Sequence, residues 1–158
     1  MVGSETLQNI RHTTTNIHKM ALSHIVATDY TTMITVVAQI KEEEKTLETY
    51  LQEYKNYVTK EEETIYAQLL ENYDSFKHAL VYLVCASADS KTEDAYAYAN
   101  GDVAYFSSAI ESSINELYTV VSARTASARQ KLFNIYIISL LITIVSIMAC
   151  LALVFAAI

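Results

Sequence analysis

Residues 132–158 read LFNIYIISLLITIVSIMACLALVFAAI and contain no Lys, Arg, Asp or Glu. A bilayer core about 30 Å thick needs roughly 20 apolar residues in a helix that rises about 1.5 Å per residue. This stretch is therefore long enough to span a membrane, with Tyr136 placed to anchor at the headgroup level. Core helices of soluble proteins rarely run so far without a charge, and the C-terminal position excludes a signal peptide. We expect one transmembrane helix here.

The charged residues all precede this stretch. The eleven Lys and Arg residues and the eighteen Asp and Glu residues lie at or before Lys131, so the net charge of −7 belongs to residues 1–131. Nucleic-acid binding needs a basic surface against the phosphates. The acidic segment therefore argues against a nucleic-acid partner, and its length predicts one domain of ordinary size.

Residues 1–131 contain few residues that break helices, because the whole chain has no proline and only two glycines, Gly3 and Gly101. An all-β chain would need a turn signal about every 8 to 12 residues, which this composition does not supply. The spacing of apolar residues predicts helices at about 4–27, 31–57, 60–88, 91–99 and 103–131. We expect an all-α fold: an antiparallel four-helix bundle whose last helix continues into the transmembrane helix at 132–158.

Two of the expected helix starts carry Ser or Thr followed three residues later by Glu, the reciprocal capping pattern. These pairs are Thr59 with Glu62 and Ser90 with Glu93. In the first pair the Thr hydroxyl should accept the amide of Glu62, and the helix should begin near Lys60.

The other expected breaks depend on Asp, Asn and Gly. Asp29 can cap the second helix. Asn100 and Gly101 suit a helix end in left-handed geometry, after which Asp102 can cap the last helix.

Catalytic motifs are missing from the sequence, which has no GxxxxGK phosphate loop, no GxSxG elbow, no HExxH and no CxxC. None of the four histidines follows a Glu at the three-residue spacing that di-iron bundles use. We therefore expect no enzyme activity, no metal and no cofactor. Cys85 and Cys150 are interpreted as packing residues.

Tyrosine is unusually frequent, at twelve of 158 residues. Tyr30, Tyr96, Tyr98 and Tyr105 fall near the two loops that an antiparallel bundle brings together at one end. Tyr offers apolar area and one polar group, which suits recognition of small molecules. If the bundle senses a small molecule, we predict that these four residues line the site, at the end away from the membrane. The alternative is that they pack the loop end of the bundle.

A resemblance rests on the order of several segments. They are the helix end at Leu47 to Thr59, the run Lys60-Glu61-Glu62-Glu63, Tyr73 with Phe76, Glu93-Asp94-Ala95, Asn100-Gly101-Asp102, and Phe106, Ile110 and Leu117 before the membrane helix. In this order the chain resembles the four-helix-bundle sensor domain of bacterial methyl-accepting chemotaxis receptors and related membrane sensor proteins.

The resemblance implies an extracytoplasmic sensing bundle in the plasma membrane that acts as a homodimer. Its ligand would be a small molecule or a ligand-binding partner protein, and the last helix would pass the signal to a cytoplasmic region. The resemblance also implies a fragment that lacks the first membrane helix and the cytoplasmic signalling part. No family binding motif appears here, so no site residues are transferred.

An alternative follows from Arg124, Arg129 and Lys131, which flank the N-terminal side of the span with no charge after it. The positive-inside rule would place the bundle in the cytoplasm. The chain would then be a tail-anchored tethering or interaction protein. We prefer the sensor, because basic residues downstream in a longer chain would remove the conflict.

Overall fold

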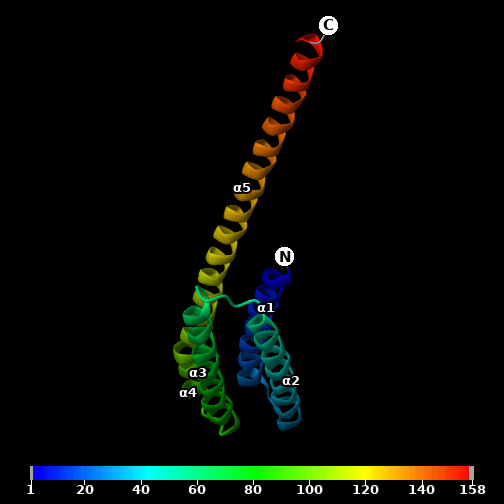
Figure 1. Ribbon diagram of the computed structural model, residues 1–158. Helices are drawn as coiled ribbons and strands as arrows, with labels where there is room; N and C mark the ends of the chain where they lie inside the picture. The colour runs from blue at the N-terminus through cyan, green and yellow to red at the C-terminus, as the bar shows by residue number, and fades with distance from the viewer. Residues whose placement is uncertain (1, 157–158) are drawn as a thin grey trace. The chain divides into compact units, whose positions relative to one another are not determined.

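The computed structural model describes residues 2–156, and the elements in that range are helices (Figure 1). They are α1 (Val2–Val26), α2 (Tyr30–Lys55), α3 (Glu63–Ala88), α4 (Thr92–Tyr98), the π-helical segment η1 (Ala99–Val103) and α5 (Ala104–Ala156). The chain divides into two compact units, Met1–Val120 and Val121–Ile158, and α5 contributes to both. The distribution of charged residues in the sequence instead predicts a domain boundary after Lys131.

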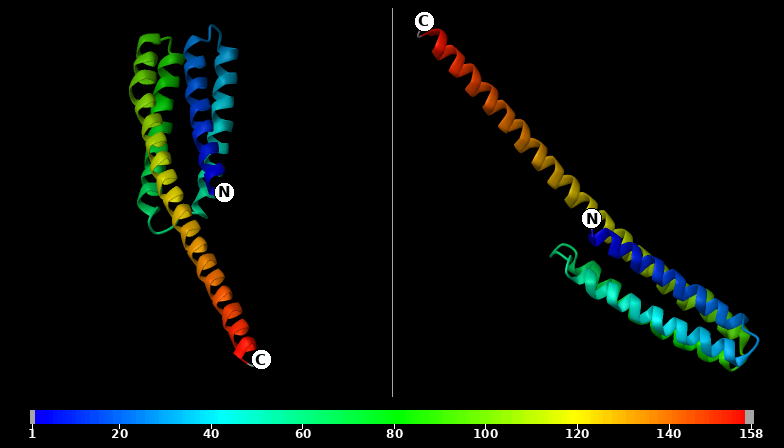
Figure 2. Two further views of the ribbon diagram at one scale, coloured as in Figure 1. Left: turned by 90° about the horizontal axis from the view of Figure 1, so that it is seen from above. Right: turned by 90° about the vertical axis from the view of Figure 1, so that its right-hand side faces the viewer.

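The first unit is an antiparallel four-helix bundle, as expected. α1 and α3 run in one direction, and α2 and the start of α5 run in the other (Figure 2). Hydrogen bonds join neighbouring helices: Tyr66 Oη to the Leu51 carbonyl at 2.8 Å, Asn72 Nδ2 to Ser113 Oγ at 3.4 Å, and Arg11 Nε to Glu111 Oε2 at 2.8 Å. A further hydrogen bond joins residues that are far apart in the sequence, near the two ends of this unit. Tyr118 Oη donates to the Ser4 carbonyl at 2.6 Å.

The core follows the apolar stripes of the sequence. On α3 the apolar residues at alternating steps of four and three, Leu69, Tyr73, Phe76, Leu80 and Leu83, are buried. Each large apolar side chain that is buried in this way contributes about 1.5–3 kcal/mol to the free energy of folding. These apolar faces therefore supply most of the free energy that packs the helices together. Glu44 interrupts the α2 stripe and is half-buried, and this burial raises its pKa.

The start of α2 is capped as the sequence indicates. Asp29 has extended backbone, and its Oδ1 accepts the Thr32 amide at 2.8 Å while Oδ2 accepts the Thr32 hydroxyl at 2.7 Å. These hydrogen bonds favour the charged carboxylate and lower the pKa of Asp29.

The start of α3 is capped differently from the expectation. Glu62 Oε2 accepts the Thr59 amide at 2.9 Å, which is the Glu half of the capping pattern. The Thr59 hydroxyl, however, donates to the same carboxylate at 2.6 Å and does not accept the Glu62 amide. Residues 60–62 form a turn and α3 begins at Glu63, so the predicted start near Lys60 is wrong. The carboxylate of Glu62 is buried, where Tyr54 Oη also donates to it at 3.3 Å.

The predicted cap at Ser90 is wrong. Ser90 has a φ of 61°, in the left-handed region, and it ends α3 instead of starting α4. The Lys91 amide donates to the Ala86 carbonyl at 2.9 Å and the Ser90 amide to the Ser87 carbonyl at 3.1 Å. This is the hydrogen-bond pattern that closes many helix C-termini around a glycine. α4 has Lys91 at its N-cap, with no side-chain hydrogen bond there.

The predicted break at Asn100 and Gly101 is present, but its predicted left-handed geometry is wrong. α4 ends at Tyr98 and α5 begins at Ala104. Between them Gly101 has φ −94° and ψ −105°, which is neither helical nor left-handed, so the chain is kinked there. Asp102 lies inside the connecting segment η1 instead of capping a new helix.

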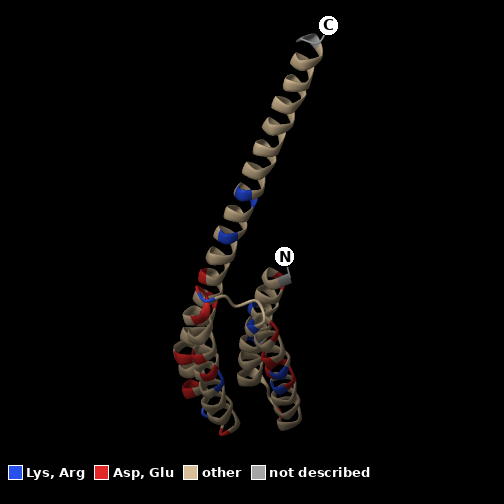
Figure 3. Cartoon of the chain, viewed as in Figure 1, with Lys and Arg blue, Asp and Glu red and all other residues tan. Residues whose placement is uncertain are grey.

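The second unit consists of the rest of α5. Residues 122–154 are exposed, and their most apolar 18-residue window has a mean hydropathy of 2.9. By length and composition, one helix within the described residues is long and apolar enough to cross a membrane, and it includes this window. Figure 3 shows Lys and Arg near the start of this unit and no charged residue beyond them. Cys85 is exposed on α3, so the expectation that it is a packing residue is wrong, whereas Cys150 lies in the apolar part of α5 and its packing role stays a prediction.

Candidate ligand-binding site

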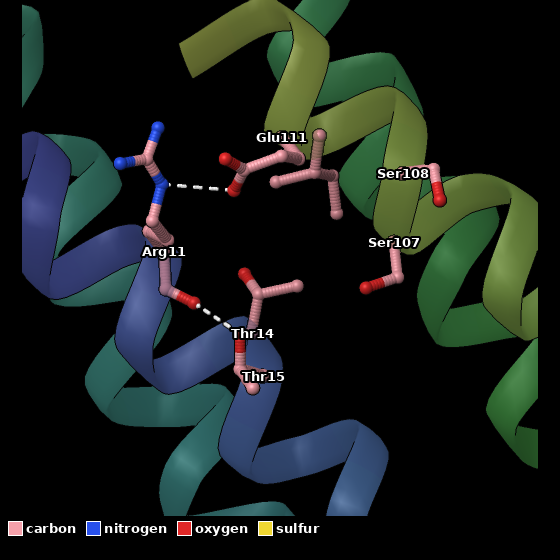
Figure 4. Close-up of a pocket in the computed structure, with 7 residues that line it drawn as sticks. Arg11, Thr14, Thr15, Ser107, Ser108 and Glu111 are labelled. Carbon is pink, nitrogen blue, oxygen red and sulfur yellow. Dashed lines mark hydrogen bonds and ion pairs between the residues drawn. The ribbon is translucent and has the colours of Figure 1, made fainter. Parts of the chain in front are cut away.

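The bundle contains a cleft of about 240 Å³ between α1 and the first part of α5 (Figure 4). Its walls are mostly polar. They are formed by Arg11, Thr14, Thr15, Ser107, Ser108, Ile110 and Glu111.

Helical spacing explains how these residues meet. Arg11, Thr14 and Thr15 lie within one turn of α1, and Ser107 with Glu111 lie one turn apart on α5. Figure 4 shows Thr14 and Ser107 pointing toward the same space from the two helices. Thr and Ser are small, so they leave room between helices where larger core residues would fill it.

Arg11 is held in place by three neighbours. Its Nε donates to Glu111 Oε2 at 2.8 Å and its Nη2 donates to Asn115 Oδ1 at 2.6 Å. The guanidinium carbon also lies 5.5 Å from the centre of the Tyr118 ring. A partly exposed ion pair of this kind adds at most about 1 kcal/mol to stability. Its larger effect is to fix a positive and a negative group at the edge of the cleft.

The hydroxyl groups add acceptors to this charged pair. Thr14 donates its hydroxyl hydrogen to the Ile10 carbonyl at 2.9 Å, and Thr15 donates to the Arg11 carbonyl at 3.0 Å. Their oxygen lone pairs remain able to accept hydrogen bonds. The cleft therefore combines a guanidinium, a carboxylate and several hydroxyls, which suits a small polar solute with both donors and acceptors.

The four tyrosines predicted from the sequence lie outside this cleft. Tyr30, the first residue of α2, is 70% exposed, Tyr96 on α4 is 39% exposed and Tyr105 on α5 is 67% exposed. Tyr98 is partly buried and stacks on Tyr82 with 5.8 Å between ring centres. Tyr105 contacts Phe106 edge to face at 5.1 Å. Among the described residues, no ring contact joins two of the four, and ligand binding by them stays a prediction.

Sequence reasoning missed the cleft because its two walls are about a hundred residues apart in the chain. Thr14 is buried, so its position in the sequence does not separate it from the residues of the core. Two patterns in the sequence could together have indicated the cleft. They are the run Thr13 to Thr15 and the pair Ser107 and Ser108, which lie on helices that a four-helix bundle places side by side. Within the described residues, no group of three or more His, Cys, Asp or Glu is placed to hold a metal ion.

One comparison with known proteins gives a result. A family model described as a four helix bundle sensory module for signal transduction matches residues 1–132. The match covers the charged part of the chain and stops at Leu132, the first residue of the apolar stretch. No curated protein and no solved structure matches the chain at a significant level.

Proposed function

We propose that this chain, which belongs to the family of four-helix-bundle sensory modules for signal transduction, is the ligand-sensing part of a chemotaxis-type membrane receptor. One observation carries the proposal. Helix α5 supplies a wall of the polar cleft near its start and the candidate membrane span near its end.

The proposed mechanism is a shift between two positions of α5 in the bundle. Ser107, Ser108 and Glu111 of the cleft are on α5, whereas Arg11 is on α1. A ligand that bridges the two helices stabilises the arrangement in which their groups fit it best. It can shift the equilibrium only by the difference in its affinity for the two arrangements. Interface helices that respond in this way move by about 1–2 Å.

The ligand class follows from the cleft. We propose a small polar solute that carries an anionic group for Arg11 and donors for Glu111 and the hydroxyls. In this proposal the receptor sits in the plasma membrane as a homodimer with the bundle outside the cell. Sensing through a ligand-binding partner protein is the alternative to direct binding.

Thermal unfolding of the whole chain in lipid nanodiscs tests direct sensing. The probes are a panel of amino acids and small dicarboxylates, each added at millimolar concentration. A ligand present at 100 times its Kd stabilises the folded state by about 2.7 kcal/mol, which gives a clear rise in Tm. We expect at least one probe to raise Tm and Arg11→Gln to abolish the rise.

Lys19→Gln is the matched control, because Lys19 is an exposed cation on the same helix outside the cleft. A Tm rise that survives in Arg11→Gln would place binding elsewhere. No response to any probe would count against direct sensing and in favour of a partner protein.

The second candidate is the tail-anchored interaction protein with a cytosolic bundle, favoured by Arg124, Arg129 and Lys131 before the span. A cysteine-free variant with Ala97→Cys separates the two, since Ala97 is exposed on α4. A membrane-impermeant thiol reagent should label intact cells if the bundle is extracytoplasmic. Labelling only after lysis would reject the receptor orientation.

A further inference from the structure

A second cleft, of about 260 Å³, lies on another face of the bundle, between α3 and the η1 to α5 junction. It shares no lining residue with the α1/α5 cleft. Its walls are formed by Ser75, His78, Ala79, Tyr82, Asp102 and Phe106.

The local fold brings these six residues together. The four from α3 follow the spacing i, i+3, i+4, i+7 and so occupy one face of that helix. Asp102 and Phe106 are four residues apart, but Asp102 lies in the π-helical segment η1 and Phe106 in α5. Ala99 and Val103 are buried on either side of the kink at Gly101, while Asp102 lines the cleft.

The polar groups of this second cleft can accept hydrogen bonds, because the hydroxyls of Ser75 and Tyr82 accept as well as donate, and Asp102 also carries negative charge. Within the described part of the chain, no hydrogen bond or ion pair reaches the Asp102 carboxylate. His78 Nδ1 lies 2.8 Å from the Asp74 carbonyl oxygen, which can only accept, so the hydrogen is on Nδ1. In the neutral ring Nε2 is then an acceptor.

No positive residue competes for this space. The lining contains no Lys or Arg. Lys77, the one Lys of α3, instead pairs with Glu48 on α2, with 3.1 Å between Nζ and Oε1. An ammonium ion in the cleft would therefore meet no Lys or Arg side chain in the walls.

Two aromatic rings complete the site, and each is supported by another ring. Tyr82 is 60% exposed yet stacks on Tyr98, with 5.8 Å between ring centres and 21° between planes. Phe106 packs against Tyr105 at 5.1 Å and 79°. Ring faces carry partial negative charge and attract cations, ammonium groups included. A ring that is held in place loses less side-chain freedom when a ligand binds.

We propose that this second cleft binds a small organic ammonium ion. The Asp102 carboxylate pairs with the positive charge, and the rings of Tyr82 and Phe106 contact the apolar body of the ion. The site stands independently of ligand binding in the α1/α5 cleft, because the two share no residue. It also gives Tyr98 and Tyr105 a specific part, in which they support the two rings.

Titrations followed by ligand-observed NMR test the proposal on the whole chain in dodecyl maltoside micelles, which carry no ammonium group. The probes are choline and phenethylamine, and empty micelles serve as the blank. The uncharged comparison is 3,3-dimethyl-1-butanol, in which carbon replaces the quaternary nitrogen of choline. We expect saturable binding of at least one cation and at least tenfold weaker binding of the uncharged isostere.

Two variants and two controls assign the site. Asp102→Asn and Tyr82→Ala should each weaken cation binding at least tenfold. Asp94→Asn removes an exposed carboxylate from α4 outside the cleft and should leave the affinity unchanged, as should Lys19→Gln, which removes an exposed charge from α1. Far-UV circular dichroism and Tm confirm that each variant is folded. Equal binding of choline and its isostere, unchanged affinity in a folded Asp102→Asn variant, or no saturable binding of either cation would each overturn the proposal.

Discussion

The imidazole Nδ1 of His24 lies 2.9 Å from the hydroxyl oxygen of Ser87, and both side chains are buried where α1 and α3 meet. The Ser87 hydroxyl is also 3.2 Å from the His24 carbonyl oxygen, to which it donates. Since the serine hydrogen goes to that carbonyl, the serine oxygen is left to accept a hydrogen bond from Nδ1. The pair joins two helices that run in the same direction in the bundle.

This pair predicts a loss of stability in mild acid. Burial lowers the pKa of His24 from its ordinary value of 6.5, so the unfolded chain binds the proton more readily than the folded one. The free energy of unfolding should therefore fall as the pH drops below about 6.5, and level off below the folded pKa. Urea unfolding of the whole chain in micelles, at pH values from about 7.5 down to about 5, measures the slope.

His24→Gln should reduce this pH dependence, because Gln does not titrate. His18 is also partly buried with a lowered pKa, so part of the slope should remain. The double variant His18→Gln with His24→Gln should remove more of the slope than either single change. An unchanged slope in the double variant would exclude these two histidines as its source.

Ser90→Gly should stabilise the bundle. Ser90 holds a φ of 61°, a conformation that costs an L-residue roughly 1 kcal/mol and costs glycine little. We expect a gain of about 0.5–1 kcal/mol in the free energy of unfolding. Ser112→Gly is the control, because Ser112 is an exposed residue inside α5, where glycine costs roughly 0.5 kcal/mol or more. We expect the free energy of unfolding to rise for Ser90→Gly and to fall for Ser112→Gly. An equal fall for both substitutions would contradict the prediction.

Asp29→Ala should lower the Tm at neutral pH by removing the cap of α2. The hydrogen bonds from Thr32 hold the pKa of Asp29 below its ordinary value, so its stabilisation is present at higher pH and is lost as the pH falls through the folded pKa. The Tm difference between the native chain and Asp29→Ala should therefore shrink in strong acid. Asp29→Asn retains a capping oxygen without the charge and should keep much of the Tm at neutral pH. A Tm difference that is constant with pH would argue against a charged cap.

Val145→Asp should impair membrane insertion. Val145 is exposed near the middle of the apolar part of α5, and an Asp at the centre of a span costs about 2.5–3.5 kcal/mol for insertion. We expect more of this variant than of the native chain in the carbonate-soluble fraction of cell membranes. Ser122→Asp precedes the apolar part and should leave the distribution unchanged. Equal membrane retention of Val145→Asp and the native chain would speak against residues 132–158 as the span.

The sequence allowed the bundle and the apolar helix to be predicted, because both depend on local patterns. The α3 stripe from Leu69 to Leu83 needs only helical periodicity, and the charge-free stretch after Lys131 needs only composition. Asp29 was predictable for the same reason, since its cap involves a residue only three positions away.

The errors concern choices that tertiary packing decides. Ser90 precedes a Glu at the capping distance, but the same residue can close the preceding helix, and closing α3 there is what the bundle selects. Gly101 follows Asn in a pair that commonly adopts left-handed geometry, yet Gly101 has a negative φ, and Ala99 and Val103 on either side of the kink are buried. Arg11 and Glu111 face each other only because the first and last helices are neighbours, which no short pattern encodes.

The kinked segment η1 at Ala99–Val103 also fixes the rotational phase of α5. Successive residues of an α-helix are about 100° apart around its axis, so deleting one residue here would turn every later side chain of the bundle by about that angle. Glu111 would rotate away from Arg11, and Ile110, Ile114 and Leu117 would leave the core. The segment therefore makes chain length in this region a strict constraint, so that homologous chains which keep this core should keep the same number of residues between Ala95 and Ile110.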